Sequence, residues 1–217
     1  MKAARVRIST EIVVFSVRGQ SLSVLLTAPT TDEFRNFRLP GGIAGVDEDL
    51  DATARRYLLR DTGLSGVYLE QLYTFGRPDR DPRGRVVSVA YYALVPASEF
   101  EQSEHTGECE LAWHRVDRLP ILALDHGDIV RVAHRRLAAK LGYSTIGLQL
   151  MPRTFTLSAL QQVFEAVLHE PLDKRNFRKR LFGMDCLEDT GQEAREGKHR
   201  PARLYRVKRP GRVRIVR

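Results

Sequence analysis

The sequence has few cysteines and no metal-binding pattern of histidines. Only Cys109 and Cys186 occur among 217 residues, and they are too far apart to match a metal-ligand spacing. The six histidines likewise form no set with such a spacing. Cysteines this sparse are typical of a reducing cytoplasm. We therefore expect a cytoplasmic protein with no bound metal.

Long hydrophobic runs are also missing. The longest mostly apolar stretch, residues 86–95, has ten residues and is interrupted by Ser88, whereas a spanning helix needs about 20. No long apolar segment follows the first residues, Met1 to Arg7, so we expect no secretory signal. The sequence therefore predicts no contact with a membrane.

The composition is that of an ordinary folded protein, but the charge is unevenly distributed. Hydrophobic residues make up 42% of the chain and charged residues 29%, which excludes wholesale disorder. The formal net charge is +8. Residues 151–217 hold 16 Lys and Arg against 8 Asp and Glu, whereas the charges of residues 1–150 cancel. A neutral first part and a basic second part predict two functions, the second involving a polyanion.

Residues 1–145 are predicted to form an α+β domain. Apolar, β-branched runs at 11–17 and 22–26 are separated by a turn and indicate a hairpin. Apolar residues at helical spacing predict one helix that includes Leu50, Ala54 and Leu58 and ends at Gly63. Further strands are expected at 67–75, 86–95 and 111–116, and a second helix at 127–141.

Residues 146–217 are predicted to form a winged helix-turn-helix domain, after a connection at 142–152. Thr156 is expected to cap a first helix, and Asp173 a strongly basic second helix that ends near Phe182. Two short strands are expected at 186–188 and 204–207, with a flexible wing between them. Helix, basic helix and β-wing is the order of a winged helix.

The segment from Gly42 to Leu64 resembles the Nudix box, whose family pattern is G-x5-E-x7-R-E-U-x-E-E-x-G-U, with U aliphatic. The matching residues are Gly42, Glu48, Arg56, Leu58, Gly63 and Leu64, preceded by Leu39-Pro40-Gly41. The resemblance implies that residues 1–145 form a Nudix-like α/β/α sandwich with a mixed sheet.

The box departs from the family where the metal ligands would be. Tyr57, Arg60 and Asp61 replace three glutamates, and their spacing places them on one helical face. Three carboxylates there would hold Mg²⁺, whereas an aromatic ring and a cation would not. We therefore expect no bound Mg²⁺ and no enzymatic hydrolysis, with Arg60 contacting a phosphate directly. Glu48 remains open between a ligand role and a solvated or capping acid.

An arginine-rich loop at residues 75–85 is the second feature that points to a nucleotide. Its arginines offer bidentate donors to phosphate, and an aromatic ring beside it offers a stacking surface for adenine. Alternatively, the arginines pair with Asp79 and Asp81 in a solvated loop. Similarity to the loop of Nudix proteins acting on ADP-ribose favours ligand contact. The candidate ligand residues are Arg38, Arg60, Tyr73, Phe75, Arg77, Arg83 and Arg85.

The basic helix and the wing carry the candidate DNA contacts. A recognition helix presents its outer face to the major groove, and a wing suits phosphates or the minor groove. The candidates are Lys174, Arg175, Asn176, Arg178 and Lys179 on the helix, and Lys198, His199, Arg200 and Arg203 on the wing. Asn176 either binds a base or helps to cap the helix. The basic tail at 208–214 is expected to be mobile and to act only through its charge.

Over nearly its whole length the chain is similar to the Nudix-related transcriptional regulators of NAD metabolism, the NrtR family. The degenerate box, the loop at 73–85, the segment 86–92, Asp125-His126, residues 172–181 and residues 200–206 carry this resemblance. It implies a homodimer that binds a palindromic operator on double-stranded DNA and represses genes of NAD biosynthesis or salvage. It also implies that ADP-ribose or a related nucleotide is the effector. The alternatives are a regulator of the same architecture that responds to a sugar or other metabolite, and a residual ADP-ribose pyrophosphatase.

Overall fold

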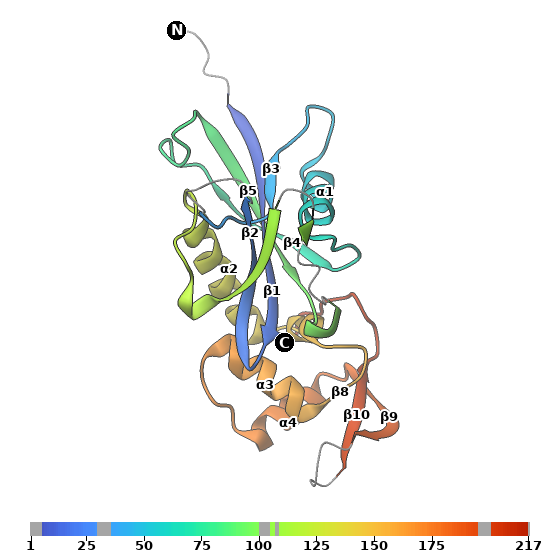
Figure 1. The fold of residues 1–217 in the computed structure, drawn as a ribbon. Helices are drawn as coiled ribbons and strands as arrows, with labels where there is room; N and C mark the ends of the chain where they lie inside the picture. The colour runs from blue at the N-terminus through green and yellow to red at the C-terminus, as the bar shows by residue number, and fades with distance from the viewer. Residues whose placement is uncertain (1–5, 30–35, 100–104, 107–108, 195–200, 217) are drawn as a thin grey trace. The chain divides into compact units, whose positions relative to one another are not determined.

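The computed structural model describes residues 6–29, 36–99, 105–106, 109–194 and 201–216 (Figure 1). Its contacts divide the chain into two compact units. The first unit contains Met1–Phe15, Ser23–Leu94 and Gln102–Arg135, and the second contains Ser16–Leu22, Val95–Glu101 and Arg136–Arg217. The domain boundary between residues 145 and 146 stays a prediction. No helix within the described ranges is both long and apolar enough to span a membrane.

A mixed sheet forms the centre of the first unit. Its strands are β1 (Arg7–Arg18), β2 (Ser21–Pro29), β3 (Gly41–Ile43), β4 (Tyr68–Phe75), β5 (Val86–Leu94), β6 (His105–Thr106) and β7 (Cys109–Arg115). Within the described residues the strand order is β4-β5-β1-β2-β7-β6, with β3 paired to β1. β1 and β5 are parallel, whereas the other pairs are antiparallel.

Two helices cover this sheet. α1 (Leu50–Thr62) and α2 (His126–Leu141) lie on opposite sides of it in Figure 1, which confirms the predicted sandwich. β1 is buried on both faces from Ile12 to Phe15, as expected for a central strand. α1 begins at the cap Asp49 and ends at Gly63, whose φ of 73° suits a glycine stop. Short 3₁₀ helices, η1 (Ala97–Glu99) and η2 (Val116–Arg118), complete the connections.

The second unit has the winged-helix order that the sequence predicts. Its elements are η3 (Ile146–Leu150), β8 (Phe155–Thr156), α3 (Leu157–Leu168), α4 (Lys174–Gly183), β9 (Leu187–Ala194) and β10 (Ala202–Val207), with strand order β8-β10-β9 in the described residues. The predicted caps are confirmed, because Thr156 accepts from the Ala159 N–H and Asp173 from the Asn176 N–H. Phe164 of α3 meets Phe177 of α4 edge to face at 5.1 Å, which docks the two helices.

Two predictions for this unit are wrong in detail. β9 extends to Ala194 rather than ending at residue 188, because pairing with β10 orders polar residues that have no apolar alternation. The tail at 208–214 is not free, since Thr145 and Arg214 exchange hydrogen bonds of 3.0 and 2.9 Å. Its backbone therefore belongs to the folded unit.

Candidate functional site

The first unit contains a cavity of about 370 Å³, called here the Nudix cavity. Residues of β1, β3, the loop at 80–83 and the start of α2 line it. The lining residues are Ser9, Glu11, Arg38, Leu39, Gly41, Gly42, Ile43, Arg80, Asp81, Arg83, Val86, Ala123, Leu124 and His126. Two predicted ligand residues, Arg38 and Arg83, are among them. Arg60, Tyr73, Phe75, Arg77 and Arg85 do not line this cavity, so the predicted set is not brought together.

A buried arginine organises one wall of the Nudix cavity. Arg80 is 3% exposed, and its guanidinium donates to both carboxylate oxygens of Asp125, at 3.0 and 2.7 Å. The same guanidinium lies 4.0 Å from the Glu11 carboxylate. A cation is rarely buried without paired acids, and Asp125 and Glu11 supply the negative charge that faces Arg80 inside the fold.

Glu11 has an unusual environment for an acid. It is 7% exposed, and Ser9 donates a hydrogen bond of 2.9 Å to one carboxylate oxygen. The other oxygen is buried without a hydrogen bond among the described residues. Burial raises the pKa of Glu11 from 4.5 to about 7, although Arg80 and Ser9 oppose this shift. The Nudix cavity therefore contains a carboxyl group that changes its charge near neutral pH.

The raised pKa of Glu11 makes stability depend on pH. Because the folded state favours the protonated carboxyl, this contribution to stability is present below pH 4.5 and is lost as pH rises toward 7. We expect the free energy of unfolding of Glu11→Gln, relative to that of the native protein, to rise by up to roughly 3 kcal/mol from pH 4.5 to pH 8. Urea unfolding followed by fluorescence of the single tryptophan, Trp113, measures this difference. A difference that is the same at both pH values would contradict the prediction.

His126 begins α2 and also lines the Nudix cavity. Its Nδ1 accepts a hydrogen bond of 2.9 Å from the Leu39 N–H. Burial lowers the pKa of His126 to about 4, so the ring is neutral at physiological pH. The neutral ring thus anchors the Leu39-Pro40 backbone beside the cavity.

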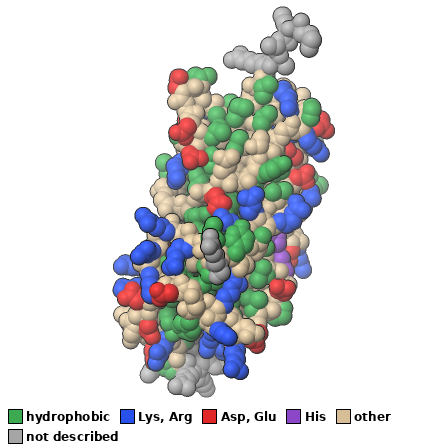
Figure 2. Space-filling model, turned by 180° about the vertical axis from the view of Figure 1, so that it is seen from behind, with side chains coloured by type: hydrophobic (Ala, Val, Ile, Leu, Met, Phe, Trp, Pro, Cys, Tyr) green, Lys and Arg blue, Asp and Glu red, His purple; other side chains and the backbone are tan. Residues whose placement is uncertain are grey.

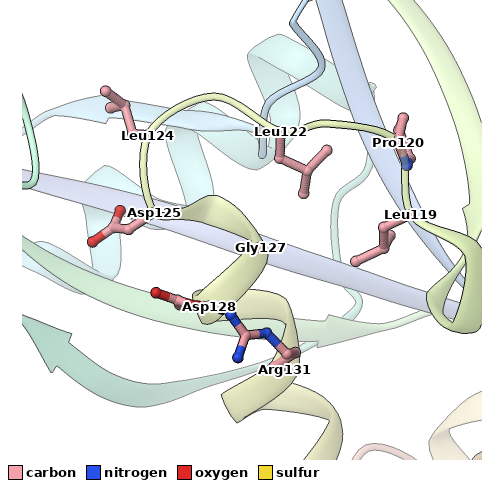
Figure 3. A pocket seen from close by; sticks show the side chains of 8 residues that line it. All are labelled: Leu119, Pro120, Leu122, Leu124, Asp125, Gly127, Asp128 and Arg131. Carbon is pink, nitrogen blue, oxygen red and sulfur yellow. Dashed lines mark hydrogen bonds and ion pairs between the residues drawn. The ribbon is translucent and has the colours of Figure 1, made fainter.

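The loop before α2 also borders a smaller cavity of about 220 Å³ (Figure 3). Figure 3 shows the loop from Leu119 to Asp125 arching over the first turn of α2. Asp128 and Arg131, one turn apart on the helix, form an ion pair at its wall. Asp125 lines this cavity while it binds Arg80. Asp125 therefore connects the start of α2 to the buried arginine.

The remaining arginines of the 76–85 loop make local contacts. Arg83 binds the Asp81 carboxylate through two hydrogen bonds of 2.9 Å, and Arg77 lies 3.5 Å from Asp79. Arg83 also lowers the pKa of Asp81 to about 2. The two arginines thus pair with Asp79 and Asp81 as the alternative expects, but Asp81 is buried rather than solvated, and Arg83 still reaches the Nudix cavity. A role for either one in ligand binding stays a prediction.

The other predicted ligand residues lie apart from the cavity. Arg85 donates to the Gly76 carbonyl at 2.8 Å. Tyr73 and Phe75 contact each other edge to face at 5.5 Å, with Tyr73 59% exposed. The two rings therefore form an aromatic surface on β4, and stacking on adenine stays a prediction.

The degenerate box is filled by its own residues. The guanidinium carbons of Arg56 and Arg60 each lie 4.3 Å from the Tyr57 ring centroid, and the Tyr57 hydroxyl donates to the Ile43 carbonyl. Asp61 accepts from Arg60 at 2.5 Å and from the Gly41 N–H at 3.0 Å. The helical face that carries three glutamates in the Nudix pattern thus carries a tyrosine, an arginine and an aspartate that is paired with that arginine.

Glu48 is likewise engaged within the box. Arg56 donates to both of its oxygens, at 2.8 and 2.6 Å, and the Thr53 hydroxyl donates at 2.8 Å. These bonds lower the pKa of Glu48 to about 2. In the described part of the chain, no three His, Cys, Asp or Glu side chains are placed to hold a metal ion. The donor set around Tyr57 does not fit Mg²⁺, which prefers oxygen ligands, and function without Mg²⁺ stays a prediction.

Close packing against Tyr57 gives a test of this arrangement. A Cβ added at Gly42 would lie 2.5 Å from the Tyr57 ring, so we expect Gly42→Ala to destabilise the first unit by roughly 1–3 kcal/mol. Gly45→Ala is the matched control, because its Cβ would meet Glu48 at an ordinary 3.5 Å. Urea unfolding of both variants measures the difference. Equal stability of the two would show that the Tyr57 ring does not occupy this place.

In the second unit, α4 presents an unpaired basic face. Phe177 and Leu181 are buried, whereas Lys174, Arg175 and Lys179 are exposed and Arg178 is half-buried. None of these four cations has a hydrogen bond or ion pair from its side chain to another described residue. The helix cap is Asp173, so the exposed Asn176 side chain is not needed for capping. The geometry is that of a recognition helix, although each base contact stays a prediction.

The wing is described only in part. Arg203 is exposed on β10 and lies 3.2 Å from Asp189 of β9. Lys198, His199 and Arg200 lie outside the described residues. The predicted contacts of the wing with DNA therefore stay predictions.

Sequence reasoning missed Glu11 and Arg80 as parts of the site. Glu11 lies within a run of buried β-strand residues, and an acid in such a run is the signal that could have identified it. Arg80 stands between Asp79 and Asp81 in a polar loop, where no local pattern distinguishes it from a surface arginine.

Known protein families match both parts of the chain. A NUDIX domain model matches residues 6–137, and an NrtR DNA-binding winged helix domain model matches residues 147–207. An "ADPR responsive transcriptional repressor NtrR" from Acinetobacter baylyi is 37% identical over 204 residues, covering 91% of this chain and 80% of the relative.

Two solved structures from Shewanella oneidensis are also similar. NrtR complexed with a 27mer DNA has 33% identity and a TM-score of 0.79, covering 93% of each chain. The NUDIX domain of NrtR complexed with ADP ribose has 32% identity and a TM-score of 0.53, covering 63% of this chain and 90% of that one. The likeness therefore extends over both parts of the chain.

Proposed function

This chain belongs to the NrtR family, and from that membership we propose that it is a transcriptional repressor that responds to ADP-ribose or a related NAD metabolite. The winged helix binds operator DNA, and the Nudix domain binds the effector. The relative from A. baylyi is named as an ADP-ribose-responsive repressor, and the S. oneidensis relatives were solved with DNA and with ADP ribose. Control of NAD biosynthesis or salvage genes and a cytoplasmic location belong to the same proposal.

The observation that carries this proposal is the unpaired basic face of α4. Its four cations form no ion pair within the described structure, whereas Phe177 and Leu181 hold the opposite face of the helix in the core. A rigid helix with free Lys and Arg side chains is suited to the phosphates and base edges of a major groove.

The Nudix domain acts in this proposal as a sensor and not as an enzyme. Arg38 and Arg83 at the Nudix cavity supply positive charge for the diphosphate of the effector. Tyr57 and Arg60 occupy positions where hydrolysis would require carboxylates. The test is incubation of ADP-ribose with Mg²⁺ and a high concentration of the protein, and release of AMP would overturn this part of the proposal.

The repressor acts in this proposal as a homodimer. Two winged helices related by a two-fold axis read the half-sites of a palindrome, and their spacing sets the affinity for the operator. The effector changes that affinity if it favours one dimer geometry over another, by the reciprocity of linked equilibria. Light scattering after size exclusion measures the oligomeric state, and a monomer under operator-binding conditions would contradict this model.

Operator binding is the main test of the proposed function. We expect fluorescence anisotropy with DNA from upstream of NAD biosynthesis genes to show saturable binding, and we expect added ADP-ribose to change the midpoint. Unrelated DNA of equal length is the control, since charge alone gives weaker, salt-sensitive binding to any sequence. Binding to no fragment would contradict the repressor. Operator binding that responds to a sugar but not to ADP-ribose would favour the alternative regulator.

A further inference from the structure

The second unit contains a cavity of about 370 Å³ to which the proposed function gives no role, called here the tail cavity. The end of β10 and the C-terminal segment supply four cations to its lining, Lys208, Arg209, Arg212 and Arg214. Leu148, Cys186 and Val207 supply an apolar part. All of its lining residues belong to the second unit.

The backbone of the C-terminal segment is fixed at both ends of this cavity. The Lys208 N–H donates to the Cys186 carbonyl at 3.0 Å, which holds the start of the segment. Thr145 and Arg214 exchange two hydrogen bonds, and the Val216 N–H donates to the Tyr143 carbonyl at 2.7 Å. Between these points the chain reverses through Gly211, whose φ is 75°. The cations are therefore carried on a closed loop rather than on a loose end.

The lining residues of the tail cavity carry more positive than negative charge. Asp185 is the one acid among the lining residues, and it is paired with Lys208. The side chains of Arg209, Arg212 and Arg214 make no hydrogen bond or ion pair with another residue that the structure describes. Figure 2 shows a gathering of Lys and Arg side chains on the left side of the face that it draws. Three like charges around one hollow repel one another unless an anion lies between them.

From this geometry we propose that the tail cavity is a phosphate-binding site. Three guanidinium groups offer planar, bidentate donors that match the oxygens of a phosphate. The size of the cavity suits a small phosphorylated compound, and its apolar part offers a contact for the remainder of such a ligand. A phosphate of a DNA strand presents the same oxygens. A small phosphorylated compound and a DNA strand would thus be recognised through the same phosphate oxygens, and the experiment distinguishes between these two ligands.

The experiment compares the full-length protein with the double variant Arg209→Gln/Arg212→Gln. Neither side chain has a partner in the described structure, so the variant is expected to keep the native thermal denaturation midpoint. Arg55→Gln on α1 is the control for loss of an exposed positive charge. Calorimetry with pyrophosphate tests a free phosphorylated ligand, and anisotropy with duplex DNA at several salt concentrations tests a strand.

We expect the double variant to lose about tenfold or more in affinity for at least one probe, with the Arg55 control unchanged. Loss for pyrophosphate alone identifies a small-molecule site. Loss for DNA alone, equal for all sequences and with a salt slope lower by about two, identifies a backbone contact. Equal binding of both probes by native protein and double variant, or binding of neither probe by the native protein, overturns the proposal. Sequence-specific DNA binding and the response to ADP-ribose are measured separately. A failure of the proposed repressor function can therefore be distinguished from a failure of the proposed phosphate site.

Discussion

Replacement of Arg80 by methionine is expected to lower the free energy of unfolding of the first unit by roughly 3–5 kcal/mol. The substitution leaves two acids, Asp125 and Glu11, buried without their cation. Asp125 loses two hydrogen bonds, at 3.0 and 2.7 Å, although its side chain is only 7% exposed. Urea unfolding followed by Trp113 fluorescence measures the loss at pH 7.

The matched control is Arg77→Met, which removes an arginine of the same loop. Arg77 and Asp79 are 68% and 77% exposed, so this ion pair contributes less than about 1 kcal/mol. The double variant Arg80→Met/Asp125→Leu is expected to recover part of the loss, because no unpaired acid then remains at that position. Equal effects of the Arg77 and Arg80 single variants would show that the Arg80 cluster is not buried as described.

The sequence predicts the elements of this fold well where a local rule determines them. The helix ending at Gly63 and the helices capped by Thr156 and Asp173 follow from patterns within a few residues, and all three are confirmed. The basic α4 is recognisable for the same reason. Its charges and its buried Phe177 alternate at helical spacing within a single segment.

The features that the sequence does not reveal depend on contacts between distant residues. Arg80 meets Asp125, 45 residues away, and Arg214 meets Thr145, 69 residues away. Arg80 and Arg214 each lie in a segment with the composition of a solvated loop or tail, so local patterns predict that both side chains are exposed. The ordering of β9 beyond residue 188 likewise comes from its partner β10 and not from its own polar residues. Long-range pairing, therefore, determines the Nudix cavity wall and the tail cavity.

Phe177 connects the stability of the second unit to its proposed function. The ring is 5% exposed and packs edge to face on Phe164 at 5.1 Å, so Phe177→Ala is expected to destabilise this unit by roughly 3–5 kcal/mol. The loss also frees α4 from α3, and the cations of the basic face are then no longer held in one orientation. We therefore expect operator affinity to fall together with stability, as measured by circular dichroism at 222 nm and by anisotropy.

Phe182 on the same helix provides the control. It is 55% exposed and contacts Tyr205 at 6.2 Å, so Phe182→Ala is expected to cost less than about 1 kcal/mol. Both variants keep every cation of α4. If the charge of the helix were sufficient for binding, the two variants would therefore have equal affinity for the operator. Weaker operator binding by Phe177→Ala than by Phe182→Ala, at a temperature where both remain folded, would show that α4 must be docked to read DNA. Equal operator affinity there would show that its charge is sufficient.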